Sequence, residues 1–213
     1  MTASRPAAPA TAQQRRGYWL RTLHQWHWIS AAVSLVVLLL FTVTGITLNH
    51  AAQIEAEPTV TSVTGELPTS VLKTLQGGIA GDAPLPASLR RWLDAELGVR
   101  VDERAAEWSE GEVYVSLPRP GGDAWLAIDR DAGTVEYELT TRGTIAWLND
   151  LHKGRNTGAV WRWFIDIFAI ACLLFALTGL WLLQLHARQR GSTWPLVAAG
   201  LAVPALVVIL FMH

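Results

Sequence analysis

The chain has 213 residues, of which 51% are hydrophobic, and its formal net charge at pH 7 is −1. A near-neutral chain lacks the concentrated positive charge of nucleic-acid-binding proteins, so nucleic acid is excluded as a partner. A single cysteine, Cys172, excludes an intramolecular disulfide, and the absence of a C-x-x-C-H motif excludes covalent attachment of a c-type haem.

The first long apolar run predicts a transmembrane helix. The run "WISAAVSLVVLLLFTVTGITL", residues 28–48, contains no charged residue and is long enough to cross about 30 Å of hydrocarbon as a helix. The residues before it are basic, and the first 14 have the composition of a disordered tail. We therefore predict a cytoplasmic tail over 1–22 and a first transmembrane helix over 23–49.

The next segment, residues 50–158, has the pattern of a small α+β domain. The stretches "TSVLKTLQGG" and "ASLRRWLDAELGV" are helical in character and end at Gly77 and Gly98. The stretch "EVYVSLPRPGGDAWLAIDRDAGTVEYEL" alternates apolar and polar residues between turn signals, which predicts an antiparallel meander. A short helix, "TIAWLNDLHKG", leads back to the membrane. No phosphate loop, dinucleotide fingerprint or Ser-His-Asp order is present, and we predict no catalytic side chain.

Two more apolar runs complete the chain. They are "WFIDIFAIACLLFALTGLWLLQL" and "WPLVAAGLAVPALVVILFM", the second of which we expect to kink or open at Pro204. Tryptophans flank all three runs, as rings do at a membrane interface, so contact with membrane lipid is expected. The predicted segments are a second transmembrane helix over 159–186, a cytoplasmic loop over 187–193 and a third helix over 194–213.

Basic residues predict the orientation, since cytoplasmic loops carry an excess of Lys and Arg. Four arginines precede the first helix and two lie between the second and third, whereas Lys153, Arg155 and Arg162 lie on the opposite side. We take the first helix as decisive. The fold expected is therefore an integral α-helical membrane protein of the bacterial inner membrane, with a cytoplasmic N-terminus, a periplasmic C-terminus and an extracytoplasmic domain between helices 1 and 2.

Five histidines lie near the ends of the apolar runs. On a continuous helix His24 and His50 would be separated by roughly 39 Å, and so would lie at opposite faces of the bilayer. The topology supplies an outer pair, His50 with His152. It also supplies an inner pair, His186 with either His24 or His27, between which the spacing cannot choose.

Pairs of imidazoles on adjacent helices suit haem iron, which accepts one axial nitrogen on each side of the porphyrin. We therefore predict non-covalent haem b, one or two per chain, although each histidine alone could be an ordinary interfacial residue. Arg162 and Asp166 share one helical face. Arg162 is either the partner of the haem propionates or an ion-pair partner that lowers the cost of burying Asp166.

The stretches "RTLHQWHW", "TGITLNH", "LHKG" and "DIFAIACLLFALTGLWL" resemble the PepSY-associated transmembrane family. The resemblance covers the first two spans well and the insert loosely, and it implies a PepSY-like extracytoplasmic domain. By resemblance, His24, His50 and His152 match the motif histidines of the family, and Asp166 its acidic position. His186 rests on topology alone.

Members of that family include haem-containing membrane reductases that act on ferric iron or ferric siderophores. The resemblance thus implies a haem b oxidoreductase that takes electrons from a quinol or a cytoplasmic donor. Larger relatives have four spans, so a chain with three is expected to complete its haem sites as a homodimer. Two alternatives stay open: a non-enzymatic PepSY-type module that binds or regulates a membrane or periplasmic partner, and a haem-based sensor.

Overall fold

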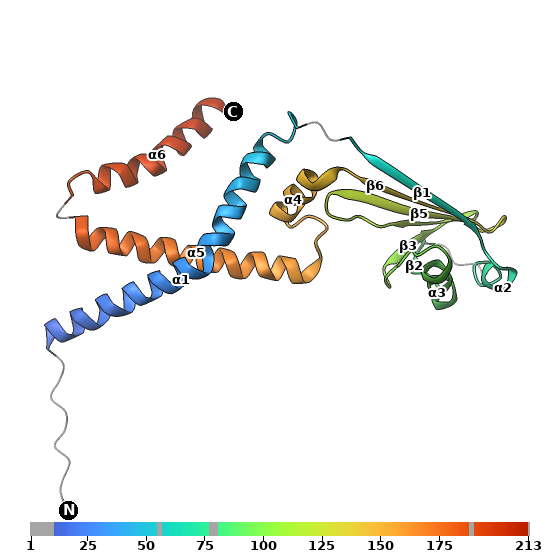
Figure 1. Cartoon of the computed structure of the whole chain (residues 1–213), viewed down its shortest axis with the longest axis horizontal. Coiled ribbons are helices and arrows are strands. Elements are labelled where there is room, and N and C mark those ends of the chain that lie inside the picture. The colour runs from blue at the N-terminus through green and yellow to red at the C-terminus, as the bar shows by residue number, and fades with distance from the viewer. Residues whose placement is uncertain (1–10, 55–56, 77–80, 188–189, 213) are drawn as a thin grey trace, which may run out of the picture. The chain divides into compact units, whose positions relative to one another are not determined.

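The computed structural model describes residues 11–54, 57–76, 81–187 and 190–212. Three helices are long and apolar enough to cross a bilayer, and a sheet domain lies between the first and second of them in the chain (Figure 1). Three apolar helices of this length suggest a multi-pass membrane protein, and the predicted α+β domain is inserted between the first two. Four parts of the prediction lie outside the described residues: residues 1–10 of the tail predicted over 1–22, the helix end at Gly77, the loop residue Arg188 and the terminal His213.

The long helices are α1 (Ala12–Asn49), α5 (Gly158–His186) and α6 (Thr193–Phe211). Helix α1 begins at Ala12, within the segment predicted as a tail. Its start is capped reciprocally, because the Thr11 N–H donates to Gln14 Oε1 (2.9 Å) and the Gln14 N–H donates to Thr11 Oγ1 (3.4 Å). Helix α6 continues through Pro204.

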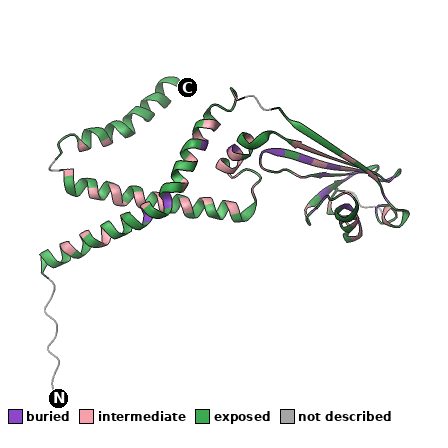
Figure 2. Ribbon diagram, in the orientation of Figure 1, coloured by how far each residue is buried: buried purple, intermediate pink, exposed green. Residues whose placement is uncertain are grey.

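Most side chains of the long helices are exposed, and no described residue of α5 or α6 is buried (Figure 2). The exceptions on α1 are small and polar: Ser30, Ser34 and Thr44. The hydroxyls of Ser30 and Ser34 donate to carbonyls of their own helix, at 2.7 and 2.6 Å. Buried small residues of this kind let helices approach closely in a membrane, so they mark the packed side of α1.

The inserted domain contains an antiparallel sheet with the strand order β1-β6-β5-β4-β3-β2. The predicted meander is confirmed as three of these strands, and Gly121 lies in the turn before β5, whose first residue is Gly122. The strands are β1 (Thr59–Glu66), β2 (Gly81–Pro84), β3 (Ala105–Trp108), β4 (Glu112–Ser116), β5 (Gly122–Asp129) and β6 (Thr134–Thr141).

Strands β1, β2 and β3 were not predicted. Strand β1 is rich in threonine and has few apolar residues, so it lacks the alternating pattern of a half-buried strand. Strands β2 and β3 have four residues each, which is too short for a pattern to stand out. All three are recognisable only from their pairing, for which β1 uses the full length of β6.

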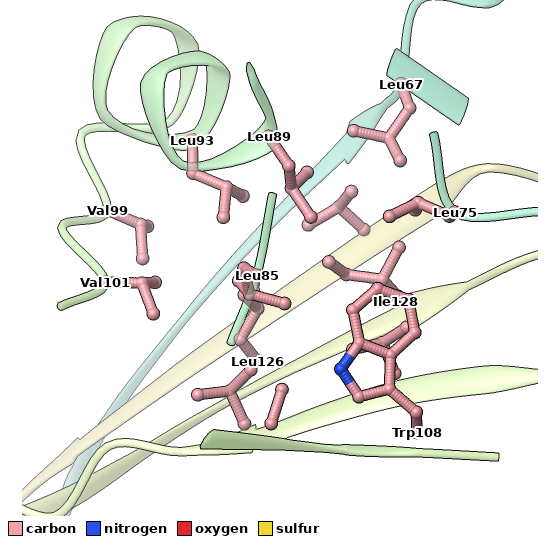
Figure 3. Close-up of a cluster of buried hydrophobic side chains, with 14 residues drawn as sticks. Leu67, Leu75, Leu85, Leu89, Leu93, Val99, Val101, Trp108, Leu126 and Ile128 are labelled. Atoms are coloured by element: carbon pink, nitrogen blue, oxygen red, sulfur yellow. The ribbon is translucent and has the colours of Figure 1, made fainter. Parts of the chain in front are cut away.

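One face of the sheet is covered by α2 (Thr69–Leu72) and α3 (Ala87–Glu96), and the core lies between them and the strands. Leu89 and Leu93 of α3 point toward Leu126 and Ile128 of β5 (Figure 3). Burial alternates along β5, with the buried residues on this face. Helix α2 is shorter than the predicted helix over 69–78, whereas α3 ends just before Gly98, as predicted.

Candidate functional site

The sequence predicted the five histidines near the ends of apolar runs, but only three of them lie at or near the ends of helices, because α1 begins at Ala12 and so contains His24 and His27 in its interior. His24 and His27 belong to α1, His50 directly follows its last residue, and His186 is the last residue of α5. His152 belongs to α4 (Gly143–Lys153). His27 and His152 are partly buried and contact a second helix, whereas the other three are exposed.

His27 packs against three residues of α5. Its Nδ1 lies 3.0 Å from Oγ1 of Thr178, and its ring stacks on Phe175 with centroids 4.8 Å apart and an interplanar angle of 17°. Its Cε1 faces Gly179, where a β-carbon would lie 3.3 Å away. We call Phe175, Thr178 and Gly179 the His27 seat.

His152 is held in the same way by three residues of α1. Its Nδ1 lies 2.7 Å from Oγ1 of Thr44, and its ring is tilted by 39° over Phe41 with centroids 4.9 Å apart. A β-carbon on Gly45 would lie 3.5 Å from its Cε1. We call Phe41, Thr44 and Gly45 the His152 seat.

Each threonine hydroxyl lies within hydrogen-bond distance both of its histidine and of backbone carbonyls of its own helix. A hydroxyl has one hydrogen to donate. Thr178 donates it to backbone carbonyls of its own helix, of Leu174 at 2.6 Å and of Phe175 at 3.1 Å, and Thr44 donates to that of Phe41 at 3.1 Å. With its hydrogen on these carbonyls, each threonine oxygen would accept from its histidine, an arrangement that requires the proton on Nδ1.

The three exposed histidines reach the same tautomer by a different route. The Nδ1 atoms of His24, His50 and His186 lie 2.8, 3.0 and 2.8 Å from the backbone oxygen four residues earlier. A carbonyl oxygen can only accept, so each ring donates from Nδ1. Among the described residues none of the five rings is hydrogen-bonded through Nε2, which leaves this lone pair for a ligand.

Two of the predicted inner ligands line one cavity. It has a volume of about 450 Å³, within the range of small-molecule and cofactor sites. His27 and His186 both line it, but His24 does not. The full lining is His27, Gly179, Leu182, Leu183, His186, Arg190 and Thr193.

Helix α4, which carries His152, is held in place by contacts with the residues next to strand β5 and is ended by a glycine. The backbone N–H of Gly121 donates to Oδ2 of Asp150 at 2.9 Å. A β-carbon on Gly121 would lie 2.6 Å from Cβ of Trp147, so only glycine allows this approach. The helix ends at Gly154, whose left-handed conformation (φ 64°) suits a helix C-cap.

The other predicted site residues are not brought together. No contact between the rings of His50 and His152 is found in the described part of the chain. Arg162 and Asp166 are exposed on α5, and neither makes an ion pair with another described residue. The described residues also contain no group of three or more His, Cys, Asp or Glu that could hold a metal ion. A haem iron needs only two such ligands from the protein.

Neither the two seats nor the place of Arg190 was predicted from the sequence. A signal for the seats was present, because the pentapeptide Phe-x-x-Thr-Gly occurs twice, as "FTVTG" at 41–45 and "FALTG" at 175–179. Each copy receives a histidine from another helix. The role of Arg190 had no signal, since only the fold brings it to the cavity.

Comparison with known proteins gives a family for the chain. A family model described as PepSY_TM-like matches residues 18–213, and thus covers the sheet domain, α5, α6 and most of α1. No curated protein and no solved structure matches the chain. The match includes both seats and the cavity.

Proposed function

The chain belongs to the PepSY_TM-like family, and from this membership we propose that it is a haem b membrane oxidoreductase. It would carry electrons from a quinol or a cytoplasmic donor across the bacterial inner membrane to ferric iron or a ferric siderophore. The observation that carries the proposal is the cavity lined by both His27 and His186. Each ring has its Nδ1 in a hydrogen bond with the protein, and no described residue is hydrogen-bonded to its Nε2.

The residues around the cavity fit an iron porphyrin. His27 and His186 supply two imidazoles, and Leu182 and Leu183 supply an apolar wall. Arg190 offers a guanidinium for the propionates, a role for which Arg162 was one candidate from the sequence. When bound, haem would supply one-electron transfer, which two imidazole ligands favour over oxygen binding.

We propose a second site at His50 and His152. His152 presents Nε2 from a seat built like that of His27, and the Nδ1–H of His50 is donated to the Ile46 carbonyl. Replacing either histidine with alanine is expected to lower the haem content from two to one per chain. An unchanged haem content in both variants would contradict this pairing.

We also propose that the chain works as a homodimer. The apolar side chains of α5 and α6 are mostly exposed in a single chain, which leaves surface for a second copy as well as for lipid. Light scattering of the purified protein in detergent gives its mass. A haem-loaded monomer would contradict the dimer.

The proposed activity can be tested with a redox-inactive control. The purified protein is reduced with dithionite without oxygen, freed of excess reductant and mixed with a ferric siderophore or with the gallium complex of the same siderophore. We expect narrow visible bands of reduced six-coordinate haem that disappear with the ferric complex and persist with gallium. Reduced bands that persist with both would contradict reductase activity and favour the sensor. Protein without haem bands, from cells supplied with haem, would favour the non-enzymatic module.

A further inference from the structure

We propose that Thr178 and Thr44 are positioning residues that each hold one histidine in the Nδ1–H tautomer and so present its Nε2 as the ligand atom. The inference deepens the proposed function, and its statement about ligation rests on that function. The assignment of the tautomer does not rest on the proposed function, because it is argued from hydrogen bonds within the protein.

The same three contacts surround the rings of both His27 and His152. In both copies of Phe-x-x-Thr-Gly the threonine oxygen meets Nδ1, the phenylalanine three residues earlier lies against the ring, and the glycine next to the threonine leaves room for Cε1. The sequences around the two copies differ, and the histidines come from different helices. A repeated set of three contacts around the same ring indicates a shared role.

The direction of the hydrogen bond between each threonine and its histidine also supports the Nδ1–H tautomer. For Nδ1 to accept, Thr178 would have to withdraw its proton from the backbone carbonyls to which it donates at 2.6 and 3.1 Å. Thr44 would likewise have to give up its bond to the Phe41 carbonyl. With the hydroxyl proton engaged, the oxygen is an acceptor, and it selects the ring that donates from Nδ1.

The hydrogen bonds from His27 to Thr178 and from His152 to Thr44 each join two separate helices. His24, His50 and His186 bond to carbonyls of the same helical stretch, so their rings are oriented only relative to that stretch. His27 is tied from α1 to α5, and His152 from α4 to α1. The seats therefore fix a ring relative to a second helix, as a ligand shared between helices requires.

Valine and serine variants separate the hydroxyl from the shape of the side chain. Thr178→Val and Thr44→Val remove the hydroxyl at nearly constant volume, whereas Thr178→Ser and Thr44→Ser keep it. Thr42→Val, at an exposed threonine of α1, is the control. Far-UV circular dichroism checks that each variant is folded.

Two measurements are made on each variant. Long-range ¹H–¹⁵N spectra of the haem-free protein, labelled in histidine, report the tautomer of each ring. His27→Gln and His152→Gln assign the signals. Haem transfer to excess apomyoglobin then reports how tightly the loaded protein holds its haem.

We expect each valine variant to lose the pure Nδ1–H tautomer at its own histidine only, with the serine variants and Thr42→Val like the wild type. Haem affinity should fall about 10- to 100-fold in the valine variants, the usual effect of removing the partner of a ligating histidine. Unchanged tautomers in the valine variants would overturn the inference. Changed tautomers with wild-type haem affinity would overturn its statement about ligation. Changed tautomers in a protein that never binds haem would support the seats and refute the proposed function instead.

Discussion

Gly179 lies so close to the imidazole of His27 that a β-carbon at this position would be 3.3 Å from Cε1 of the ring. This separation is tighter than most real contacts of a β-carbon, so either the ring or the helix would have to move. The corresponding distance from Gly45 to His152 is 3.5 Å, an ordinary van der Waals contact. The two seats thus share a design but differ in how closely they fit.

Gly179→Ala is therefore expected to displace His27 and weaken haem binding, whereas Gly45→Ala should be tolerated. Alanine is favoured over glycine in a helix by about 1 kcal/mol, so helix stability would not explain a loss. Gly200→Ala in α6 is the matched control, because nothing lies within 4 Å of its added β-carbon. Haem content and thermal stability of the three variants check this, and equal effects of Gly179→Ala and Gly200→Ala would contradict it.

Arg130 is expected to be essential for the sheet domain. It is buried, its Nε and Nη2 donate to the Leu75 carbonyl and its Nη1 to that of Ser109, and its guanidinium lies over the Trp108 ring, 5.5 Å from the centroid. Arg130→Met should lower the free energy of unfolding by about 3 kcal/mol, since hydrogen bonds of a charged group are lost and acceptors stay buried.

Hydrogen exchange of the sheet peptides in the full chain measures this loss. Arg91→Met is the control, because Arg91 is exposed and bonds only to the Ala87 carbonyl of its own helix. It should change stability by less than about 0.5 kcal/mol. Similar exchange in both variants would show that the contacts of Arg130 contribute little.

The position of the core can be tested by replacing a valine with alanine at a buried position and at an exposed position. Val113 is 0% exposed and Val60 is 54% exposed. Val113→Ala should destabilise the sheet by about 2 kcal/mol through lost burial and the cavity left behind, and Val60→Ala by less than about 0.5 kcal/mol. Urea dependence of hydrogen exchange in β4 and β5 gives both values. Equal losses would mean that the core is not where the structure places it.

Asp129 gives the domain a dependence on acid pH. Hydrogen bonds to its carboxylate from the backbone N–H of Ala132, and then from that of Asp131, lower its pKa in the folded state. The unfolded chain then binds the proton more readily, so the contribution to stability is present above about pH 3.9 and is lost as the pH falls through the folded pKa. A ¹³C titration of the carboxyl carbon, assigned with Asp129→Asn, should show a midpoint below about 3.9. A midpoint at or above this value would contradict the role of the turn.

Much of the architecture could be predicted because its signals are local. Hydropathy identified α1, α5 and α6, and alternation identified the strands from Glu112 to Thr141. Strand β1 could not be predicted, because its only strong determinant is pairing with β6. The early start of α1 depends on two side-chain caps between Thr11 and Gln14, a weaker signal than the apolar run that follows.

The candidate site was predictable only in part. The positions of the histidines near the ends of the apolar runs follow from the sequence, but a spacing of three residues cannot say whether His24 or His27 faces a neighbouring helix. Packing decides this, and it places His27 against Thr178 and in the cavity with His186. Arg190 reaches the cavity through the fold, so it could not be distinguished from Arg162 in advance.

The haem content per chain of His27→Ala, compared with that of His24→Ala, tests whether His27 is an axial ligand. The two residues are neighbours on α1, but only His27 lines the cavity with His186. We predict that His27→Ala loses the haem of this cavity and that His24→Ala keeps it, as measured by the pyridine haemochrome spectrum against protein concentration. Equal haem content in the two variants and the wild type would contradict the assignment of His27 as an axial ligand.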